Sequence, residues 1–276
     1  MNRIGFNSET ENKVHTDQEK PTAAESKEQE FAPVKSLVQV EFDGSRRQLT
    51  YYNDRFDLKP GDIVYVDGKM EGRRGRVISL SKTFKIKLSD YKRVISVAQR
   101  RVKGRLYFAG SHLVSFDRNV LPYKKVVTWL KAPISEGEEY ASSSGGETFP
   151  LDDLEQMKVS PQVAERGFHY YSGNRVCFLE LDGRKGRAIV EGTKPYELEF
   201  TYEDGQIGDL TCECFCTYIC KHELAAMLQL QETLKLIEEQ YEDSFKENGY
   251  FSAVSRNLFF TVAANGQEKG SMEVDI

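Results

Sequence analysis

The stretch Cys212-Glu-Cys-Phe-Cys-Thr-Tyr-Ile-Cys-Lys-His222 determines how the rest of this chain is interpreted. It contains four of the five cysteines, and the remaining one is Cys177. A disulfide framework usually spreads its cysteines so that they close long loops. The chain begins MNRIGFNSETENK, which lacks the apolar core of a secretory signal. We therefore expect a reducing, cytoplasmic setting, in which clustered thiols beside a histidine indicate a metal site.

The spacing within this stretch suits structural zinc, which takes four tetrahedral ligands from thiolates and imidazoles. A Cys-x-Cys pair can place two sulfurs on one side of the ion where a strand ends, and Cys220-x-His222 supplies two more ligands where a helix begins. The positive end of that helix favours the thiolate of Cys220. Cys212 and Cys214 leave five residues before Cys220, whereas Cys214 and Cys216 leave only three, which is tight for a tetrahedral site.

We therefore predict one structural zinc ion (Zn2+), held by Cys212, Cys214, Cys220 and His222. Cys216 is expected to be a bystander thiol, with roles as an alternative ligand or a redox-sensitive neighbour left open. Cys177 lies inside a predicted strand, where a buried, inert thiol is the simplest interpretation.

Charge is segregated along the chain, although the net charge is only −5. Residues 36–131 carry 21 Lys and Arg against 9 Asp and Glu, whereas residues 132–276 carry 12 against 27. Such asymmetry predicts that the basic part contacts a polyanion, DNA or RNA. The candidate contacts are Arg73, Arg74, Arg76, Lys85, Lys87, Arg100, Arg101 and Lys103. The alternative is that these side chains form ordinary solvated strand faces.

Residues 36–98 are typical of a small β-barrel, because strands of four to six residues alternate with Gly, Asp and Pro turn signals. The stretch from Pro60 to Leu80 resembles a KOW motif through Gly61-Asp62, Val64, Val66, Gly68, Gly72, Gly75 and Val77. Its glycines would allow tight turns with positive φ. The resemblance implies an SH3-like barrel that binds nucleic acid or protein. Residues 99–131 hold further strand-like pieces that we expect to extend this barrel.

The expected domain organisation follows from these composition shifts. Residues 1–35 are polar and charged, which predicts disorder, and 36–131 form the basic β-barrel domain. Residues 132–150 are rich in Ser, Gly and Glu and are typical of a linker. Residues 151–232 form the zinc-binding module, and 233–276 continue its helix and add a strand.

The second half predicts an α+β module. A short helix over LDDLEQMKV is followed by a helix that begins after the N-cap Ser160 with Pro161, and Gly173 is expected to end it in a left-handed conformation. A β-meander follows, in which Tyr196, Leu198, Phe200 and Tyr202 alternate as in a half-buried strand. A helix then starts near Lys221, and Phe259–Val262 is expected to form one more strand before a turn at Asn265-Gly266.

This pattern resembles the SWIM zinc finger, in which Cys-x-Cys, a spacer and Cys-x-His precede a helix. The upstream context of that family, a helix with an Arg-Gly and Tyr pattern and then a strand pair, is matched by Arg166-Gly167, Tyr170 or Tyr171, Gly173, Val190, Gly192 and Tyr196. The resemblance covers about 151–230. It implies the ligand set given above, and a module that docks on DNA or on a partner such as a helicase.

Several function classes lack their signatures. There is no run of about 18 apolar residues, so no membrane span is expected. There is no phosphate-binding Walker loop, no His-Glu-x-x-His pair and no Gly-x-Ser-x-Gly elbow. A closed four-ligand site leaves no position for a substrate. We expect a non-enzymatic protein without a small-molecule substrate, which binds nucleic acid through 36–131 or, alternatively, acts as a protein–protein adaptor.

Overall fold

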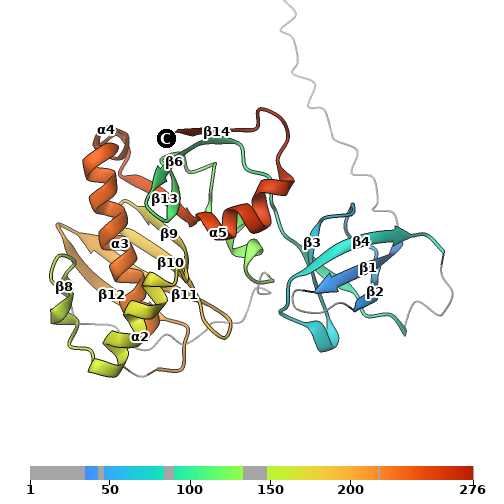
Figure 1. Ribbon diagram of the computed structural model, residues 1–276, viewed down its shortest axis with the longest axis horizontal. Helices are drawn as coiled ribbons and strands as arrows, with labels where there is room; N and C mark the ends of the chain where they lie inside the picture. The colour runs from blue at the N-terminus through green and yellow to red at the C-terminus, as the bar shows by residue number, and fades with distance from the viewer. Residues whose placement is uncertain (1–34, 43–46, 84–89, 133–147, 217, 276) are drawn as a thin grey trace, which may run out of the picture. The chain divides into compact units, whose positions relative to one another are not determined.

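The structure is a computed structural model that describes residues 35–42, 47–83, 90–132, 148–216 and 218–275. The segment expected to be disordered and most of the expected linker lie outside these residues, as do Lys85 and Lys87. The described residues form a mixed α+β fold with two sheets and a few helices (Figure 1). None of the described helices is long and apolar enough to cross a membrane.

The smaller sheet has the strand order β2-β1-β4-β3-β5. Its strands are β1 (Ser36–Phe42), β2 (Gln48–Asn53), β3 (Ile63–Val66), β4 (Gly75–Ser81) and β5 (Val94–Val97). Val38, Val40 and Phe42 are buried at period two, as expected. The predicted closed barrel is not seen in the described residues. The edge strands β2 and β5 form no ladder, and an isolated bridge joins Tyr52, next to the end of β2, to Arg93, just before β5.

Two positions in the smaller sheet require glycine, one in a turn and one in a strand. Gly72, in the turn before β4, has φ of 75°, a conformation that glycine adopts without strain. Gly75 pairs with Phe42 on β1, and a Cβ atom there would lie 2.3 Å from a methyl carbon of Val40. Only glycine allows the two strands to approach this closely.

The larger sheet has nine strands in the order β14-β6-β7-β13-β9-β10-β11-β12-β8. The strands are β6 (Gly104–Ala109), β7 (His112–Ser115), β8 (Phe149–Pro150), β9 (Val176–Asp182), β10 (Lys185–Glu191), β11 (Pro195–Glu203), β12 (Gln206–Cys212), β13 (Tyr250–Ser255) and β14 (Met272–Asp275). The expected meander is confirmed as β9–β12, which are antiparallel neighbours. By contrast, residues 99–131 do not extend the small sheet, because β6 pairs with β7 and β7 pairs with β13.

The main helices are α2 (Pro161–Ser172) and α3 (Lys221–Gln240). Ser160 caps α2, since its hydroxyl accepts a hydrogen bond from the amide of Val163 at 3.3 Å. Gly173 was wrongly predicted to be left-handed: its φ is −80°, and Asn174 takes the positive φ of 53° instead. Asparagine tolerates this region better than most residues.

The shorter helical pieces were only partly expected. They are α1 (Tyr123–Val126), α4 (Glu242–Lys246), α5 (Arg256–Leu258), the 3-10 turns η1 (Gly68–Met70), η3 (Val127–Trp129), η4 (Leu154–Met157) and η6 (Ala264–Gly266), and the π-helical turn η5 (Phe259–Ala263). The expected helix over LDDLEQMKV is thus one 3-10 turn, η4.

The predicted strand at Phe259–Val262 is wrong, because this segment is helical from Arg256 to Gly266. The Ser255 hydroxyl accepts a hydrogen bond from the amide of Leu258 at 3.2 Å and so begins the helical turn. Phe259 and Val262 are buried at a spacing that suits a helix as well as an irregular strand. The actual strand is β13, which lies just before this segment and is buried at every position.

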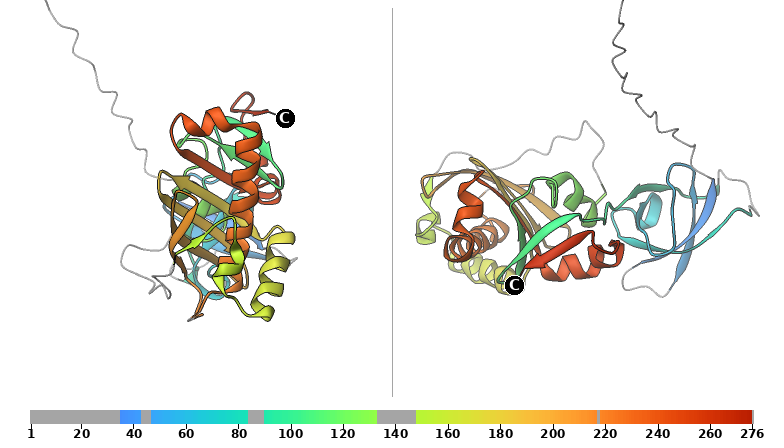
Figure 2. Two further views of the ribbon diagram at one scale, coloured as in Figure 1. Left: turned by 90° about the vertical axis from the view of Figure 1, so that its left-hand side faces the viewer. Right: turned by 90° about the horizontal axis from the view of Figure 1, so that it is seen from above.

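The larger sheet is covered on both faces, which accounts for the apolar run of β9. Leu179, Ala188 and Val190 belong to the core cluster that contains α3, whereas Phe178 and Ile189 belong to the cluster with Trp129. Helix α3 packs against β9, β10 and β12, and α2 lies alongside α3 on the same side of the meander (Figure 2). The end of β12 and the start of α3 are thereby brought next to each other.

Candidate metal centre

Two elements position the four predicted metal ligands. Cys212 is the last residue of β12, and Cys214 follows two residues later in the connection to α3. Cys220 is the N-cap of α3, and His222 lies in its first turn. Cys212, Cys220 and His222 are each only 3% exposed, while Cys214 is half-buried.

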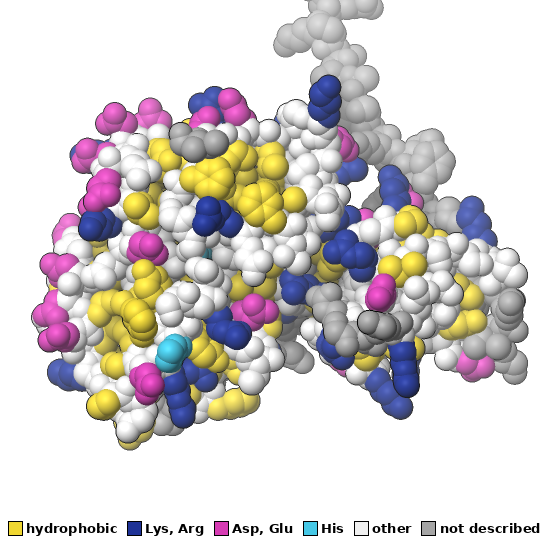
Figure 3. Space-filling model, viewed as in Figure 1, with side chains coloured by type: hydrophobic (Ala, Val, Ile, Leu, Met, Phe, Trp, Pro, Cys, Tyr) yellow, Lys and Arg dark blue, Asp and Glu magenta, His cyan; other side chains and the backbone are white. Residues whose placement is uncertain are grey.

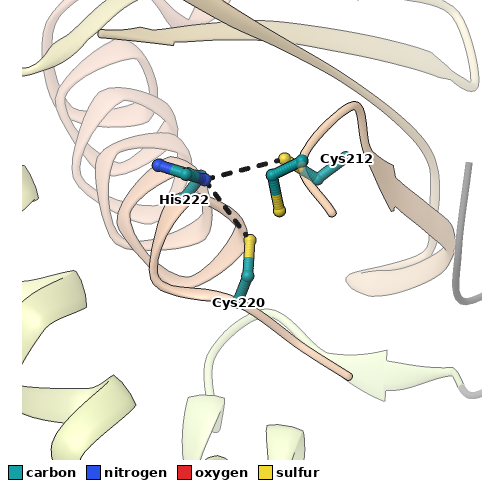
Figure 4. A group of neighbouring side chains, drawn as sticks. Cys212, Cys220 and His222 are labelled. Carbon is teal, nitrogen blue, oxygen red and sulfur yellow. Dashed lines mark hydrogen bonds between the residues drawn. The ribbon is translucent and has the colours of Figure 1, made fainter. Parts of the chain in front are cut away.

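The ligand atoms of Cys212, Cys214, Cys220 and His222 all lie within 4.8 Å of one another. The Nδ1 atom of His222 is 3.6 Å from the sulfur of Cys220 and 3.9 Å from that of Cys212 (Figure 4). Tetrahedral zinc with ordinary bond lengths requires sulfur–nitrogen separations of about 3.6 Å. The four side chains therefore fit a metal ion. Cys216 is exposed and is not part of this group.

Burial and hydrogen bonding within the cluster shift the pKa values of Cys214, Cys220 and His222. Burial, together with the neighbouring Cys220, raises the pKa of the Cys214 thiol to about 12. The hydrogen bond with Cys212, together with burial and the Glu223 carboxylate, raises the pKa of Cys220 well above the ordinary range. Burial, helped by Lys221, lowers the pKa of His222 to about 4. The His222 imidazole is thus neutral and able to bind a metal ion, whereas the thiols of Cys214 and Cys220 need a cation before they release their protons.

The His222 ring is held between two tyrosines. Tyr196 of β11 stacks on it, with centroids 4.3 Å apart and an interplanar angle of 23°, and Tyr170 of α2 meets it edge-on at 5.4 Å. A Cβ atom at Gly192 would lie 3.1 Å from Nε2 of His222 and 2.8 Å from the Tyr196 ring. Tyr170, Gly192 and Tyr196 belong to the upstream sequence pattern, and the structure brings all three to the ligand histidine.

The Nε2 atom of His222 is buried and has no hydrogen-bond partner among the described residues. Because Nδ1 faces the two sulfurs, Nε2 is the nitrogen that would keep the proton in a metal complex. The ring orientation is therefore set by the aromatic neighbours rather than by a hydrogen-bonded carboxylate.

Gly167 does not touch the predicted ligands, but it affects their surroundings through the packing of α2 against α3. A Cβ atom at this position of α2 would lie 2.7 Å from Cδ2 and 3.0 Å from Cβ of Leu224 on α3. The glycine thus allows α2 and α3 to approach closely, which places Tyr170 against His222.

Two acidic residues near the ligands were not predicted. The Glu223 carboxylate accepts a hydrogen bond from the amide of Cys220 at 2.5 Å and completes a capping box. The spacing of Cys220 and Glu223 carries this signal, because an acidic residue at the third helical position commonly reaches back to the cap. Glu223 is 1% exposed, so a carboxylate lies buried beside the thiols.

The second residue is Glu213, between two of the ligands. Its carboxylate is 3.2 Å from Nζ of Lys131, which also contacts Glu197 on β11. The Glu213 amide donates to the carbonyl of Glu197 at 3.0 Å. Burial, followed by the charge of Glu213, raises the pKa of Glu197 to about 7. No sequence signal could have paired Lys131 with a residue 82 positions away.

Several of the arginines predicted to contact nucleic acid already bind carboxylates or backbone carbonyls of this chain. Arg100 is paired with Asp62 at 3.1 Å and Arg101 with Glu268 at 3.0 Å. Arg74 and Arg76 donate to the backbone carbonyls of Trp129 and Gly61, respectively. Arg73 and Lys103 are exposed. On the face shown in Figure 3, Lys and Arg side chains gather over the small sheet and Asp and Glu side chains near α4.

No protein-family model, curated protein or solved structure matches this chain. The resemblances to the SWIM and KOW motifs therefore rest on the residues themselves.

Proposed function

We propose that this chain binds one structural zinc ion through Cys212, Cys214, Cys220 and His222, in a module of the SWIM type. The observation that carries the proposal is the convergence of three sulfurs and one imidazole nitrogen within 4.8 Å. Three thiolates with a neutral imidazole favour zinc over hard cations such as Mg²⁺ and Ca²⁺, which prefer oxygen. The four protein ligands complete a tetrahedron, so the ion acts as a clamp between β12 and α3 and not as a catalyst.

Native mass spectrometry with and without a chelator tests this proposal. Wild type and Cys216→Ser are expected to carry one zinc ion, whereas Cys220→Ser is expected to carry none. Cys216→Ser is the matched control, because it removes a thiol four residues away that lies outside the cluster. Loss of zinc from Cys216→Ser, or its retention in Cys220→Ser, would refute the ligand set.

The function of the whole chain that we favour is nucleic-acid binding by residues 36–131, without enzymatic activity. It is supported by the segregation of charge, since 21 basic and 9 acidic residues occupy that part of the chain. Binding through phosphates releases counterions, so the affinity for DNA or RNA should fall steeply with salt. An affinity that stays constant between about 50 and 200 mM salt would rule out this electrostatic model.

An adaptor role is the second candidate, and one specific observation favours it. Phe215 is 98% and Tyr218 is 83% exposed, and both lie in the connection between Cys214 and Cys220. Large aromatic side chains are enriched among the residues that dominate binding energy at protein interfaces. The substitution Phe215→Ser with Tyr218→Ser should abolish capture of a protein partner while zinc content stays at one per chain. Undiminished capture by this variant would contradict the adaptor role of the connection.

A further inference from the structure

An acidic segment lies along strand β6 of the larger sheet and along the basic stretch that leads into it. Residues 268–275, which we call the acidic strap, contain Glu268, Glu273 and Asp275. The strap ends in β14, the edge strand that pairs in parallel with β6 (Figure 1). The amide of Gly104 donates to the carbonyl of Ser271 at 3.0 Å and extends this pairing. The strap therefore lies directly along the stretch that begins with Arg100.

Each carboxylate of the strap contacts an arginine of that basic stretch. Glu268 is 3.0 Å from Arg101, while Glu273 and Asp275 are 3.1 and 3.4 Å from Nη2 and Nε of Arg105, which share one edge of the guanidinium. Two carboxylates thus take up the Nε/Nη2 edge of Arg105, the kind of edge with which an arginine can bind a phosphate in bidentate fashion. The strap occupies the positions that a polyanion would take.

The strap is held by partly buried hydrogen bonds at its first end and by exposed contacts along the rest of its length. Gln267, just before the strap, has four side-chain hydrogen bonds: its oxygen accepts from the Val102 amide and the Ser271 hydroxyl, and its amide nitrogen donates to the carbonyls of Arg100 and Ala263. By contrast, the four residues of β14 are half-buried or exposed, and they form an edge with pairing on one side only. The arginine and glutamate side chains of these ion pairs are more than half exposed. Such pairs are worth little individually and are screened by salt.

We propose that the acidic strap is an intramolecular competitor that must leave Arg101 and Arg105 before these side chains can bind the phosphates of a nucleic acid. This inference rests on the nucleic-acid function proposed above. Release requires that three exposed ion pairs, one short edge ladder and the partial packing of Met272 and Val274 exchange for contacts with phosphate, while Gln267 keeps the strap tethered.

The test neutralises the strap without removing it. The variant with Glu268→Gln, Glu273→Gln and Asp275→Asn keeps the side-chain sizes, the β14 pairing and the packing of Met272 and Val274. Its binding to a fluorescent 30-nucleotide single strand and to a 30-base-pair duplex is compared with wild type at about 50 mM salt. Three exposed ion pairs predict an affinity about threefold to tenfold higher for the variant. Circular dichroism melting confirms that both proteins are folded.

The matched control makes the same change in net charge at the opposite edge of the sheet. Asp152, Asp204 and Glu238 are exposed residues near β8, β12 and α3, and their replacement by Asn, Asn and Gln also removes three negative charges. The control should change affinity by less than about twofold, because the salt in the buffer screens distant charges. Adding Arg101→Gln and Arg105→Gln to the strap variant should cancel its gain.

The outcomes separate the strap from the function on which it rests. Equal nucleic-acid affinities for wild type and the strap variant would overturn the proposed role of the strap while leaving nucleic-acid binding in place. The same holds if the control variant gains as much affinity as the strap variant. Absence of salt-sensitive binding in every variant would overturn the proposed function and the strap together.

Discussion

Metal binding by this cluster should be strongly coupled to the release of protons. Ordinary thiols titrate near pH 8.5. Burial raises the pKa of Cys214 above that range, and the hydrogen bond with Cys212, followed by burial, does the same for Cys220. At pH 5.5–7 the thiols of Cys214 and Cys220 in the metal-free cluster therefore hold their protons. His222 holds none, because its pKa is lowered to about 4. A zinc ion that takes three thiolates and a neutral imidazole must displace three protons.

The expected magnitude follows from this count. With three protons released, the zinc dissociation constant should fall by about 1000-fold for each unit rise in pH, or about 4 kcal/mol of binding free energy. The slope should stay at three down to about pH 5.5. If His222 titrated at the ordinary value of 6.5, a fourth proton would steepen the slope below that pH.

The assay is competition between the protein and a chromophoric chelator of known affinity, at half-unit steps of pH from 5.5 to 7. Calorimetric titrations in two buffers of different ionisation enthalpy count the released protons independently. Cys216→Ser should show the same slope as wild type, because Cys216 lies outside the cluster. A slope near one, or a slope that drops to two in Cys216→Ser, would refute the ligand assignment and the protonation states derived from burial.

Three further predictions concern stability. Gly167→Ala should lower stability by about 1 kcal/mol in urea unfolding, because overpacking against Leu224 outweighs the gain in helix propensity; an unchanged or higher midpoint would contradict the close approach. Ser160→Ala should cost about 1 kcal/mol through loss of the α2 cap, and a cost near zero would show that the cap contributes nothing. Burial lowers the pKa of His112 from 6.5 to about 4, so the folded state resists protonation and stability is lost as pH falls from 6.5 toward 4. Between pH 7 and pH 5 this group should cost wild type about 2 kcal/mol. The free energy of unfolding of His112→Gln should not show this loss. Identical pH dependence of stability in the two proteins would refute the contribution of His112.

The ligand set illustrates what local spacing can predict. Cys-x-Cys at the end of a strand and Cys-x-His at the start of a helix depend on residues within eleven positions. The strand ends at Cys212 and the helix begins at Lys221, as expected. The choice between Cys212 and Cys216 also followed from chain geometry, because a three-residue connection is short for a tetrahedral site. The meander β9–β12 could also be predicted, because its turn residues and its alternation of apolar and polar side chains are local features.

The failures have a common physical cause. Tyr250–Ser255 contains two serines that interrupt the apolar alternation, so β13 was missed, although its neighbours β7 and β9 bury it completely. The next apolar run was mistaken for the strand because a short run suits a helix equally well. The assignment of residues 99–131 to the smaller sheet failed for the same reason: strand pairing depends on partners far away in the sequence.

The amino-acid sequence alone therefore sufficed to identify four side chains that can hold a metal ion, because ligand spacing, helix capping and turn chemistry act over a few residues. Only the folded chain reveals the setting of those ligands: the two tyrosines around His222, the ion pair that joins Lys131 to Glu213, and the acidic strap along β6. These contacts join residues that lie tens to more than a hundred positions apart, and such partners are selected by packing and sheet register, which no local pattern encodes.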